Sequence, residues 1–329
     1  MSNWPGTDKL ITFFLLIISP ISILPIIART FEKMVAAQLY HHCDNNSIIP
    51  EEQFGFRSKS SCEIALLKAT DSWITDVDSG MYVGALLIDL SKAFDSVPHQ
   101  KLLEELSSIG CDSIVLRWFA SYLSHREQRV TQRGVVTPWM SVTQGVPQGS
   151  GLSPLLFNIY VRNLPTSCPS SVIQFADDVT ASEAHKDVKV VVHGLAAAYD
   201  GIKLFCNDRG LTLNASKTQL IIFKTPSKKL PDDVELLLDG HSIKPLSDVK
   251  LLGFILDQHF TWGEHIDKIV KRCNGLVGAM AKATPFLTHK LLRMVYIALV
   301  RSHLEYDSTL LLSASRTQLE KLDVIQRKA

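Results

Sequence analysis

Two adjacent carboxylates, Asp177 and Asp178, interrupt a run of strand-forming residues. The run spans residues 171–181, SVIQFADDVTA, and its β-branched and aromatic residues favour two short strands joined by a tight turn. Aspartate is common in turns because its side chain hydrogen-bonds to nearby backbone. The pair alone is therefore compatible with an ordinary turn, and a third carboxylate is needed before it indicates chemistry.

A third carboxylate, Asp89, follows the apolar residues 85–88 in GALLIDLSKAFDSV. Such a run is typical of a buried strand, and a charge at its end is costly unless it is paired or bound to metal. If this strand and the hairpin are neighbours in one sheet, Asp89, Asp177 and Asp178 lie close together. A few carboxylates with room for phosphate oxygens and water describe a Mg²⁺ site. Two such ions, about 3.5 to 4 Å apart, would stabilise an in-line phosphoryl displacement.

The composition indicates a globular protein but does not show whether the protein binds nucleic acid. The chain has 329 residues, 46% apolar and 20% charged, which is enough for a large core and more than one lobe. The formal net charge of +1 says little, because a phosphate-binding groove is a local feature. Three stretches are locally basic, although basic runs on helices are also ordinary solvated faces. These stretches are residues 117–133, 217–229 and 268–293.

Cysteine and histidine spacing disfavours the common transition-metal sites. The six cysteines have no CxxC spacing, which argues against a zinc site and a disulfide framework and fits a reducing compartment. The eleven histidines include no HExxH motif. Residues 10–28 are apolar enough to resemble a signal sequence or a short membrane span, but Pro20 and Pro25 interrupt them. Membrane association is therefore the less favoured interpretation.

Amphipathic patterns and capping residues predict the helices. Residues 30–46 and 62–77 have helical periodicity, and residues 187–208 form a third predicted helix that Gly210 ends. The predicted inward side chains are Phe31, Met34, Val35 and Leu39 in the first helix, and Ile64, Leu67 and Ile74 in the second. Other predicted helix boundaries are Pro98 at a first turn, Gly110 at a C-terminus, Asp112 as an N-cap, and Ser153 with Pro154 as N-cap and first residue.

Alternating patterns predict the remaining strands. They favour a hairpin at 127–143 with Arg133 and Gly134 at its turn, a strand pair at 211–224, and a hairpin at 249–262. Residues 226–245 are polar and acidic, typical of a surface excursion, and the chain is helical after residue 263. The glycines of QGVPQGSGLSP either let another group approach the backbone or form a tight turn. The order of elements predicts an α+β fold, with helices against one face of an antiparallel sheet.

Taken in order, these segments resemble the reverse transcriptase region of non-LTR retrotransposons of the jockey or LINE kind. The likeness covers nearly everything from about Pro20 to the C-terminus. PISILPIIARTFEK and QFGFRSKSS resemble fingers motifs, LLIDLSKAFDSV motif A, QGVPQGSGLSPLLFNIYV motif B, FADD motif C, the Lys217 region motif D, and VKLLGFILD the primer grip. Several ordered motifs at family-like spacing make the resemblance specific, whereas FADD alone would be weak.

The resemblance implies a right-hand polymerase fold with fingers, palm and helical thumb. The expected divisions are an atypical apolar leader at 1–19, fingers at 20–84, palm with a fingers insertion at 85–245, primer-grip hairpin at 246–262, and a truncated thumb at 263–329. The implied activity is that of an RNA-directed DNA polymerase, which adds deoxyribonucleoside triphosphates to a DNA primer on an RNA template. We expect an intracellular location, the nucleus included.

The resemblance also implies roles for individual residues. Asp89, Asp177 and Asp178 would hold two Mg²⁺ ions, with Mn²⁺ as an alternative, and Lys217 would protonate the leaving pyrophosphate or balance its charge. The nucleotide-binding positions implied are Arg57, Phe94, Gln148 and Gly149. The nucleic-acid-binding positions implied are Phe175, Gly253, Lys271 and Arg272. Without the resemblance, Phe94 would be interpreted as a core aromatic behind the sheet.

Three departures from the family pattern leave an alternative open. Ile18 and Ser19 replace an aromatic residue and an arginine, Phe175 replaces a tyrosine, and no upstream endonuclease precedes Pro20. A truncated or decayed element copy, or a fragmentary gene model, would explain these departures. The alternative function is therefore an RNA- or ribonucleoprotein-binding remnant without efficient synthesis.

Overall fold

The computed structural model describes residues 25–129, 131–132 and 135–328. The apolar leader, Ile18, Ser19 and the predicted turn at Arg133 and Gly134 lie outside the described residues. Within the described part of the chain, no helix is both long enough and apolar enough to cross a membrane.

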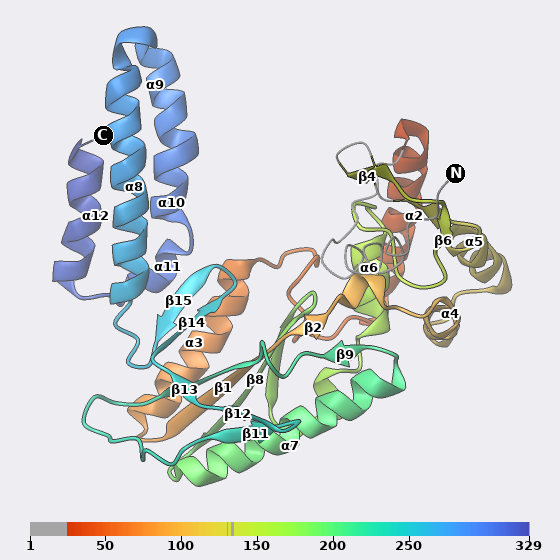
Figure 1. Cartoon of the computed structure of the whole chain (residues 1–329), viewed down its shortest axis with the longest axis horizontal. Helices are drawn as coiled ribbons and strands as arrows, with labels where there is room; N and C mark the ends of the chain where they lie inside the picture. Colours follow the sequence, from red (N-terminus) through yellow and green to blue (C-terminus); the bar gives the residue numbers. More distant parts are fainter. Residues whose placement is uncertain (1–24, 130, 133–134, 329) are drawn as a thin grey trace.

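A five-stranded sheet with order β13-β10-β1-β8-β7 forms the centre of the molecule (Figure 1). Its strands are β1 (Tyr82–Ile88), β7 (Ser171–Phe175), β8 (Asp178–His185), β10 (Gln219–Phe223) and β13 (Pro245–Leu246). The pairs are antiparallel, except that β13 runs parallel to β10. The central strand β1 is buried because it reads as a continuous apolar run with partners on both edges.

Helices cover both faces of this sheet, which corrects the prediction of helices on one face only. α7 (Val188–Asp208) packs on β1 and β8, and Gly84 permits this contact, since a Cβ there would lie 2.6 Å from the Val191 side chain. α3 (Cys62–Asp78) packs on the opposite face, where Trp73 stacks on Phe223 with ring centroids 5.1 Å apart. The α+β fold class itself is confirmed.

The segment between β1 and β7 forms a helical lobe at one end of the sheet (Figure 1). It holds η1 (Ala93–Asp95), α4 (His99–Ser108), α5 (Ser113–Leu123), α6 (Ser153–Tyr160) and η2 (Pro165–Ser167), and α2 (Ile26–Asn45) lies beside them. Short strands pair β3 (Glu127–Gln128) with β6 (Met140–Ser141), and β4 (Thr131–Gln132) with β5 (Val135–Val136). Asp112 caps α5 as predicted, accepting from the backbone N–H groups of Ile114 and Val115.

The C-terminal region forms a bundle of helices that stands away from the sheet (Figure 1). It comprises α8 (Gly263–Ala283), η3 (Thr284–Phe286), α9 (His289–Val295), the π-helical η4 (Tyr296–Arg301), α10 (Ser302–Glu305), α11 (Ser308–Leu311) and α12 (Arg316–Lys328). The hairpin of β14 (Asp248–Leu251) and β15 (Phe254–Asp257) leads into it. Trp262 fixes the junction, because its ring packs edge-on against Phe254 and its Nε1 donates to Ser313 Oγ at 2.7 Å.

The predicted inward faces of the first two helices are partly wrong. Phe31 and Met34 on α2 and Ile64 on α3 are exposed. α2 instead buries Glu32, Ala36, Leu39 and Cys43, and α3 buries Ala65, Leu66, Ala69, Thr70, Trp73 and Val77. The buried faces therefore differ from the predicted ones, although Leu39 is buried as predicted.

Three other local predictions need correction. The strands at 211–224 do not pair with each other, because β9 (Thr212–Leu213) pairs with β2 (Leu90–Ser91) while β10 joins the central sheet. The N-cap of α6 is Leu152, and Ser153 is its first residue. The polar excursion contains the hairpin of β11 (Leu236–Leu238) and β12 (His241–Ile243), in which Leu236 and Leu238 are buried.

Candidate active site

The adjacent carboxylates lie at the tip of a two-residue hairpin turn, as the sequence predicts. Phe175 pairs with Asp178, so Ala176 and Asp177 form the turn and Asp178 opens β8. Ala176 has a φ of 58°, a left-handed conformation that is unfavourable for a residue with a Cβ. Surrounding contacts must therefore hold the turn in place.

Asp89 joins these carboxylates because β1 is hydrogen-bonded to β8. The register pairs Ile88 with Val179, which places Asp89 beside the start of β8 at the Asp178 end. The backbone carbonyl of Asp89 accepts from Asn214 N at 2.9 Å, which fixes the exit of the strand. The predicted adjacency of strand and hairpin within one sheet is confirmed.

Burial and neighbouring negative charge raise the pKa values of the two adjacent carboxylates. The pKa of Asp177 is raised above its usual 3.8, first by partial burial and then by the nearby charge of Asp89. The pKa of Asp178 is raised by partial burial and then by both Asp177 and Asp89. Burial and neighbouring negative charge therefore disfavour the ionisation of Asp177 and Asp178, and a bound cation would relieve this penalty.

The donor chemistry suits Mg²⁺, which prefers a few carboxylate oxygens and retains water. In their present rotamers, however, no three acidic, histidine or cysteine side chains of the described residues are gathered tightly enough to enclose an ion. The chain thus supplies ligands of the right type at one end of the sheet, without a closed protein cage.

Lys217 brings positive charge to the same place. Its Nζ lies 3.9 Å from Asp89 Oδ2, and both side chains remain substantially exposed. A cleft of about 510 Å³ is lined by Asp89, Asp178, Lys217 and Lys250, together with Leu252 in the turn between β14 and β15. A lysine beside carboxylates in an open cleft can meet an anionic ligand, because the exposed pair is weak and easily exchanged.

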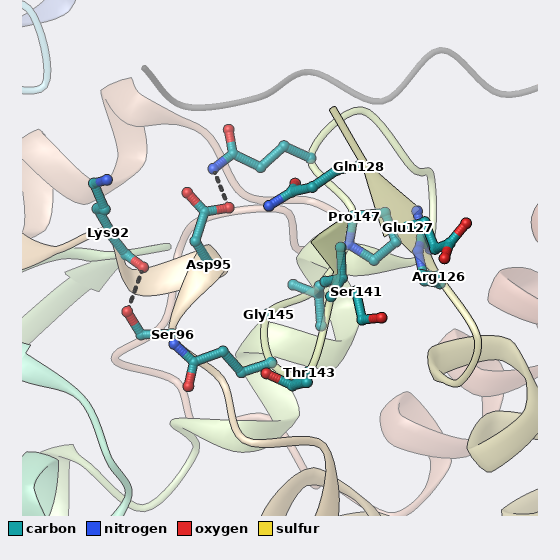
Figure 2. Close-up of a pocket in the computed structure, with 14 residues that line it drawn as sticks. Lys92, Asp95, Ser96, Arg126, Glu127, Gln128, Ser141, Thr143, Gly145 and Pro147 are labelled. Atoms are coloured by element: carbon teal, nitrogen blue, oxygen red, sulfur yellow. Dashed lines mark hydrogen bonds between the residues drawn. The ribbon is translucent and has the colours of Figure 1, made fainter. Parts of the chain in front are cut away.

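Gln148 lies in a neighbouring pocket of about 330 Å³ (Figure 2). Its Nε2 donates to Asp95 Oδ1 at 2.9 Å. Burial raises the pKa of Asp95, and the hydrogen bond from Gln148 partly offsets this. Figure 2 shows Lys92 and Asp95 on one side of the pocket and Arg126 and Gln128 on the other. The pocket is therefore polar and carries both signs of charge.

Backbone conformation favours glycine at both Gly145 and Gly149, and close packing adds a second reason at Gly145. Gly145 has a φ of 89°, and a Cβ there would lie 2.7 Å from the Asp95 carbonyl oxygen. The group that approaches Gly145 is thus the backbone of the chain itself. Gly149 has a φ of 97°, which also favours glycine. The close contact of Gly145 with Asp95 holds the loop beside η1.

Phe94 is half-buried at the edge of the main core. Its ring stacks on Phe157 of α6, with centroids 4.5 Å apart. One side of the ring thus contacts the core and the other remains accessible. This position is compatible with a core role and with contact to a ligand, so the role of Phe94 stays a prediction.

The other predicted binding residues do not line the two pockets. Arg57 is half-buried and donates to the Pro50 carbonyl at 2.6 Å. Phe175 is half-buried immediately before the Ala176–Asp177 turn. Gly253 has a φ of 95° and lies under Tyr306, whose hydroxyl donates to the Leu252 carbonyl. Lys271 and Arg272 are exposed on α8, in the bundle that stands away from the central sheet (Figure 1).

Sequence reasoning missed Gln53, Asp95 and Lys250 as residues of this region. Asp95 and Lys250 lie within motifs that were recognised, so their positions were available as signals. Gln53 begins the recognised segment QFGFRSKSS, but nothing in the sequence indicated its contact, because its partner is 123 residues further along the chain.

Comparison with known proteins places this geometry in a family. Residues 18–256 match the family described as reverse transcriptase (RNA-dependent DNA polymerase), and the chain therefore belongs to the reverse transcriptase family. Membership of this family, with the sheet and lobes described above, confirms the predicted right-hand polymerase fold class. Reverse transcriptases are in general metal-dependent enzymes.

The relatives are proteins of mobile elements, which confirms the resemblance to non-LTR retrotransposons. The chain is 27% identical over 327 residues to the probable RNA-directed DNA polymerase from transposon BS of Drosophila melanogaster, covering 94% of this chain and 35% of the relative. It is 25% identical over 324 residues to the RNA-directed DNA polymerase from mobile element jockey of the same organism, covering 94% and 34%. The chain thus spans about a third of the length of these relatives.

A solved structure of telomerase from Candida tropicalis, in complex with a TWJ fragment of telomeric RNA, also aligns with the chain. The TM-score is 0.48 at 10% identity, covering 99% of this chain and 60% of that chain.

Proposed function

We propose that this chain is the RNA-directed DNA polymerase part of a non-LTR retrotransposon protein. The observation that carries the proposal is the convergence of Asp89, Asp177 and Asp178 at one end of a sheet, with Lys217 Nζ 3.9 Å from Asp89. Carboxylates that repel one another beside a lysine in an open cleft suit a site for Mg²⁺ and polyphosphate.

The parts of the right hand follow from this assignment. The central sheet with α7 is the palm, and α3, which the expected divisions assigned to the fingers, packs on this sheet and belongs with the palm. The lobe of α2, α5 and the short β-hairpins belongs to the fingers. The β14–β15 hairpin is the primer grip, and the bundle from α8 to α12 is the thumb. Tyr306 joins thumb to primer grip through its hydrogen bond to Leu252.

Each side chain of the site has a distinct task in nucleotidyl transfer. Asp89, Asp177 and Asp178 would hold two Mg²⁺ ions, which neutralise the transferring phosphate and activate the primer hydroxyl. Lys217 stabilises the negative charge that grows on the departing pyrophosphate, or donates a proton to it. Gln148 and Gly149 border the nucleotide, and Arg57 and Phe94 contribute to its binding. Phe175, Gly253, Lys271 and Arg272 contact template and primer.

The direct test is extension of a DNA primer on an RNA template with deoxyribonucleoside triphosphates and Mg²⁺. Incorporation that follows the template sequence supports the polymerase. The alternative, a decayed RNA- or ribonucleoprotein-binding remnant, predicts retention of template-primer without extension. Measuring binding and extension on the same preparation therefore separates the two functions.

We expect template-primer binding to weaken steeply with salt, because a polymerase must tolerate all sequences and so contacts mainly the backbone. Lys271→Ala combined with Arg272→Ala should make the plot of log affinity against log salt shallower by about 1 to 2, near one for each lost phosphate contact. The measurement is fluorescence anisotropy over a salt series.

A matched control for this pair is Lys186→Ala. Lys186 is exposed in the connection from β8 to α7, at the opposite end of β8 from Asp178. Its removal should leave the slope unchanged. A wild-type affinity that is flat in salt, or a slope that the double variant does not alter, would contradict a duplex track along α8.

A further inference from the structure

A short segment from the N-terminal part of the chain lies beside β7 like an extra strand. Phe54 N donates to the Gln174 carbonyl at 2.8 Å, and Gln174 N donates to the Glu52 carbonyl at 2.8 Å. Gln53 and Gln174 therefore form a parallel bridge outside the named strands. This bridge places the buried Gln53 side chain, which is 1% exposed, under the turn that carries the candidate metal ligands.

The Gln53 side-chain amide hydrogen-bonds to both the backbone N–H and the backbone carbonyl of Ala176. Its Oε1 accepts from Ala176 N at 2.9 Å, and its Nε2 donates to the Ala176 carbonyl at 3.3 Å. Oε1 also accepts from Gly55 N at 2.8 Å, so one side chain ties its own loop to the turn. Ala176 is the left-handed residue immediately before Asp177, and such conformations persist only where the surroundings determine them.

Steric fit supports the same connection. A Cβ on Gly55 would lie 2.3 Å from Ala176 N, so the loop can approach the turn only with glycine here. The Gly55 carbonyl accepts from Asn158 Nδ2 at 2.8 Å, and Asn158 is buried on α6. A chain of contacts thus runs from α6 through Gly55 and Gln53 to the acidic turn.

We infer that Gln53 is a positioning residue that holds the Ala176–Asp177 turn in the conformation in which Asp177 and Asp178 bind metal. The inference rests on the proposed function for its catalytic consequence, but the hydrogen bonds can be tested without it. A purely structural interpretation would make Gln53 one more buried polar side chain, whose loss lowers stability without changing metal binding.

The test compares Gln53→Met with Gln174→Met. Methionine has a similar length and lacks the amide. Gln174 is equally buried and is the bridge partner of Gln53, but its side-chain amide has no hydrogen-bond partner among the residues that the structure describes. The two variants therefore make the same chemical change on neighbouring residues, and only one of them removes contacts to the turn.

Gln53→Met should accelerate hydrogen exchange in the peptide that covers residues 171–181 by about tenfold or more, because the Ala176 amide loses its acceptor. Mn²⁺ affinity, measured by electron paramagnetic resonance, should fall by a similar factor. In primer extension, kcat should fall while the template-primer Kd is kept. Gln174→Met should leave all three measurements near wild type.

If Gln53→Met does not fold, Gln53→Glu replaces it. The carboxylate keeps an acceptor for the two N–H groups but sets an oxygen against the Ala176 carbonyl, so faster exchange of the turn is still expected. Unchanged exchange and Mn²⁺ affinity in a folded Gln53 variant would overturn the inference, even if the enzyme is active. A wild-type chain that extends no primer refutes the proposed function, and the exchange experiment still decides the role of Gln53.

Discussion

Asp177→Asn is expected to abolish primer extension and, without metal, to stabilise the fold. The substitution removes a negative ligand from ions that must neutralise the transferring phosphate. A loss of about 4 kcal/mol of transition-state stabilisation slows the reaction about a thousandfold. Asp89→Asn should have an effect of the same size. Template-primer affinity should fall far less in either variant, since backbone contacts are spread over a wide surface.

The stability change has a definite sign and pH dependence. The folded-state pKa of Asp177 is raised above 3.8, so its ionisation is less favourable in the folded protein than in the unfolded chain. The Asn variant should therefore melt at a higher temperature than wild type at pH 7 to 8, in the presence of EDTA. As the pH falls through the raised pKa toward 3.8, the two melting temperatures should converge.

Asp200→Asn is the matched control, because it makes the same chemical change at an exposed position on α7. It should alter neither extension nor the pH dependence of melting. Near wild-type extension by Asp177→Asn or Asp89→Asn would show that the metal assignment is wrong. An Asn variant that melts below wild type at pH 8 would show that Asp177 is a structural anchor.

The sequence predicted those parts of the site that depend on local signals. The apolar run before Asp89 and the β-branched residues around Asp177 each specify a strand and its end, so β1, β7 and β8 were predictable. For Asp89 to lie beside Asp177 and Asp178, β1 must also pair with β8, and the order of the motifs implied this pairing. The resemblance implied Lys217 as a site residue, and its Nζ lies 3.9 Å from Asp89 Oδ2 although the strands flanking it belong to different sheets; its role stays a prediction.

What the sequence could not predict depends on partners distant in the chain. Phe31 was predicted to face inward, yet it is exposed and contacts Trp118 with ring centroids 5.7 Å apart. Periodicity identifies an apolar stripe, but the neighbouring element decides which part of it is buried. The amide of Gln53 likewise has no sequence signature, because its hydrogen bonds form only once the loop is placed under the turn.

The Phe94→Val substitution should reduce discrimination against ribonucleotides by roughly ten- to a hundredfold, the range that a few atoms produce in a close-fitting pocket. The physical reason is the space that the Phe94 ring leaves for the sugar of the incoming nucleotide. A ring close to the sugar of the incoming nucleotide leaves no room for a 2′-hydroxyl, the group that distinguishes RNA from DNA. The measurement is the ratio of deoxyribonucleotide to ribonucleotide incorporation efficiency, taken beside a thermal melt.

The packing of Phe94 sets what the melt should show. Its ring stacks on Phe157 at 4.5 Å but is only half-buried, so its truncation loses one aromatic contact worth about 0.5 to 1.5 kcal/mol and opens little enclosed space. A small drop in melting temperature is therefore expected with either role. The incorporation ratio, not the melt, decides between a sugar gate and a core aromatic.

Phe157→Leu is the matched control, because Phe157 is the ring on which Phe94 stacks. Phe157 is fully buried on α6, so this variant should lower the melting temperature clearly by leaving a cavity. It should change the incorporation ratio much less than Phe94→Val, because the ring that would face the sugar is kept. If Phe94→Val lowers the melt and leaves the ratio unchanged, Phe94 is a core residue and its assignment as the sugar gate fails.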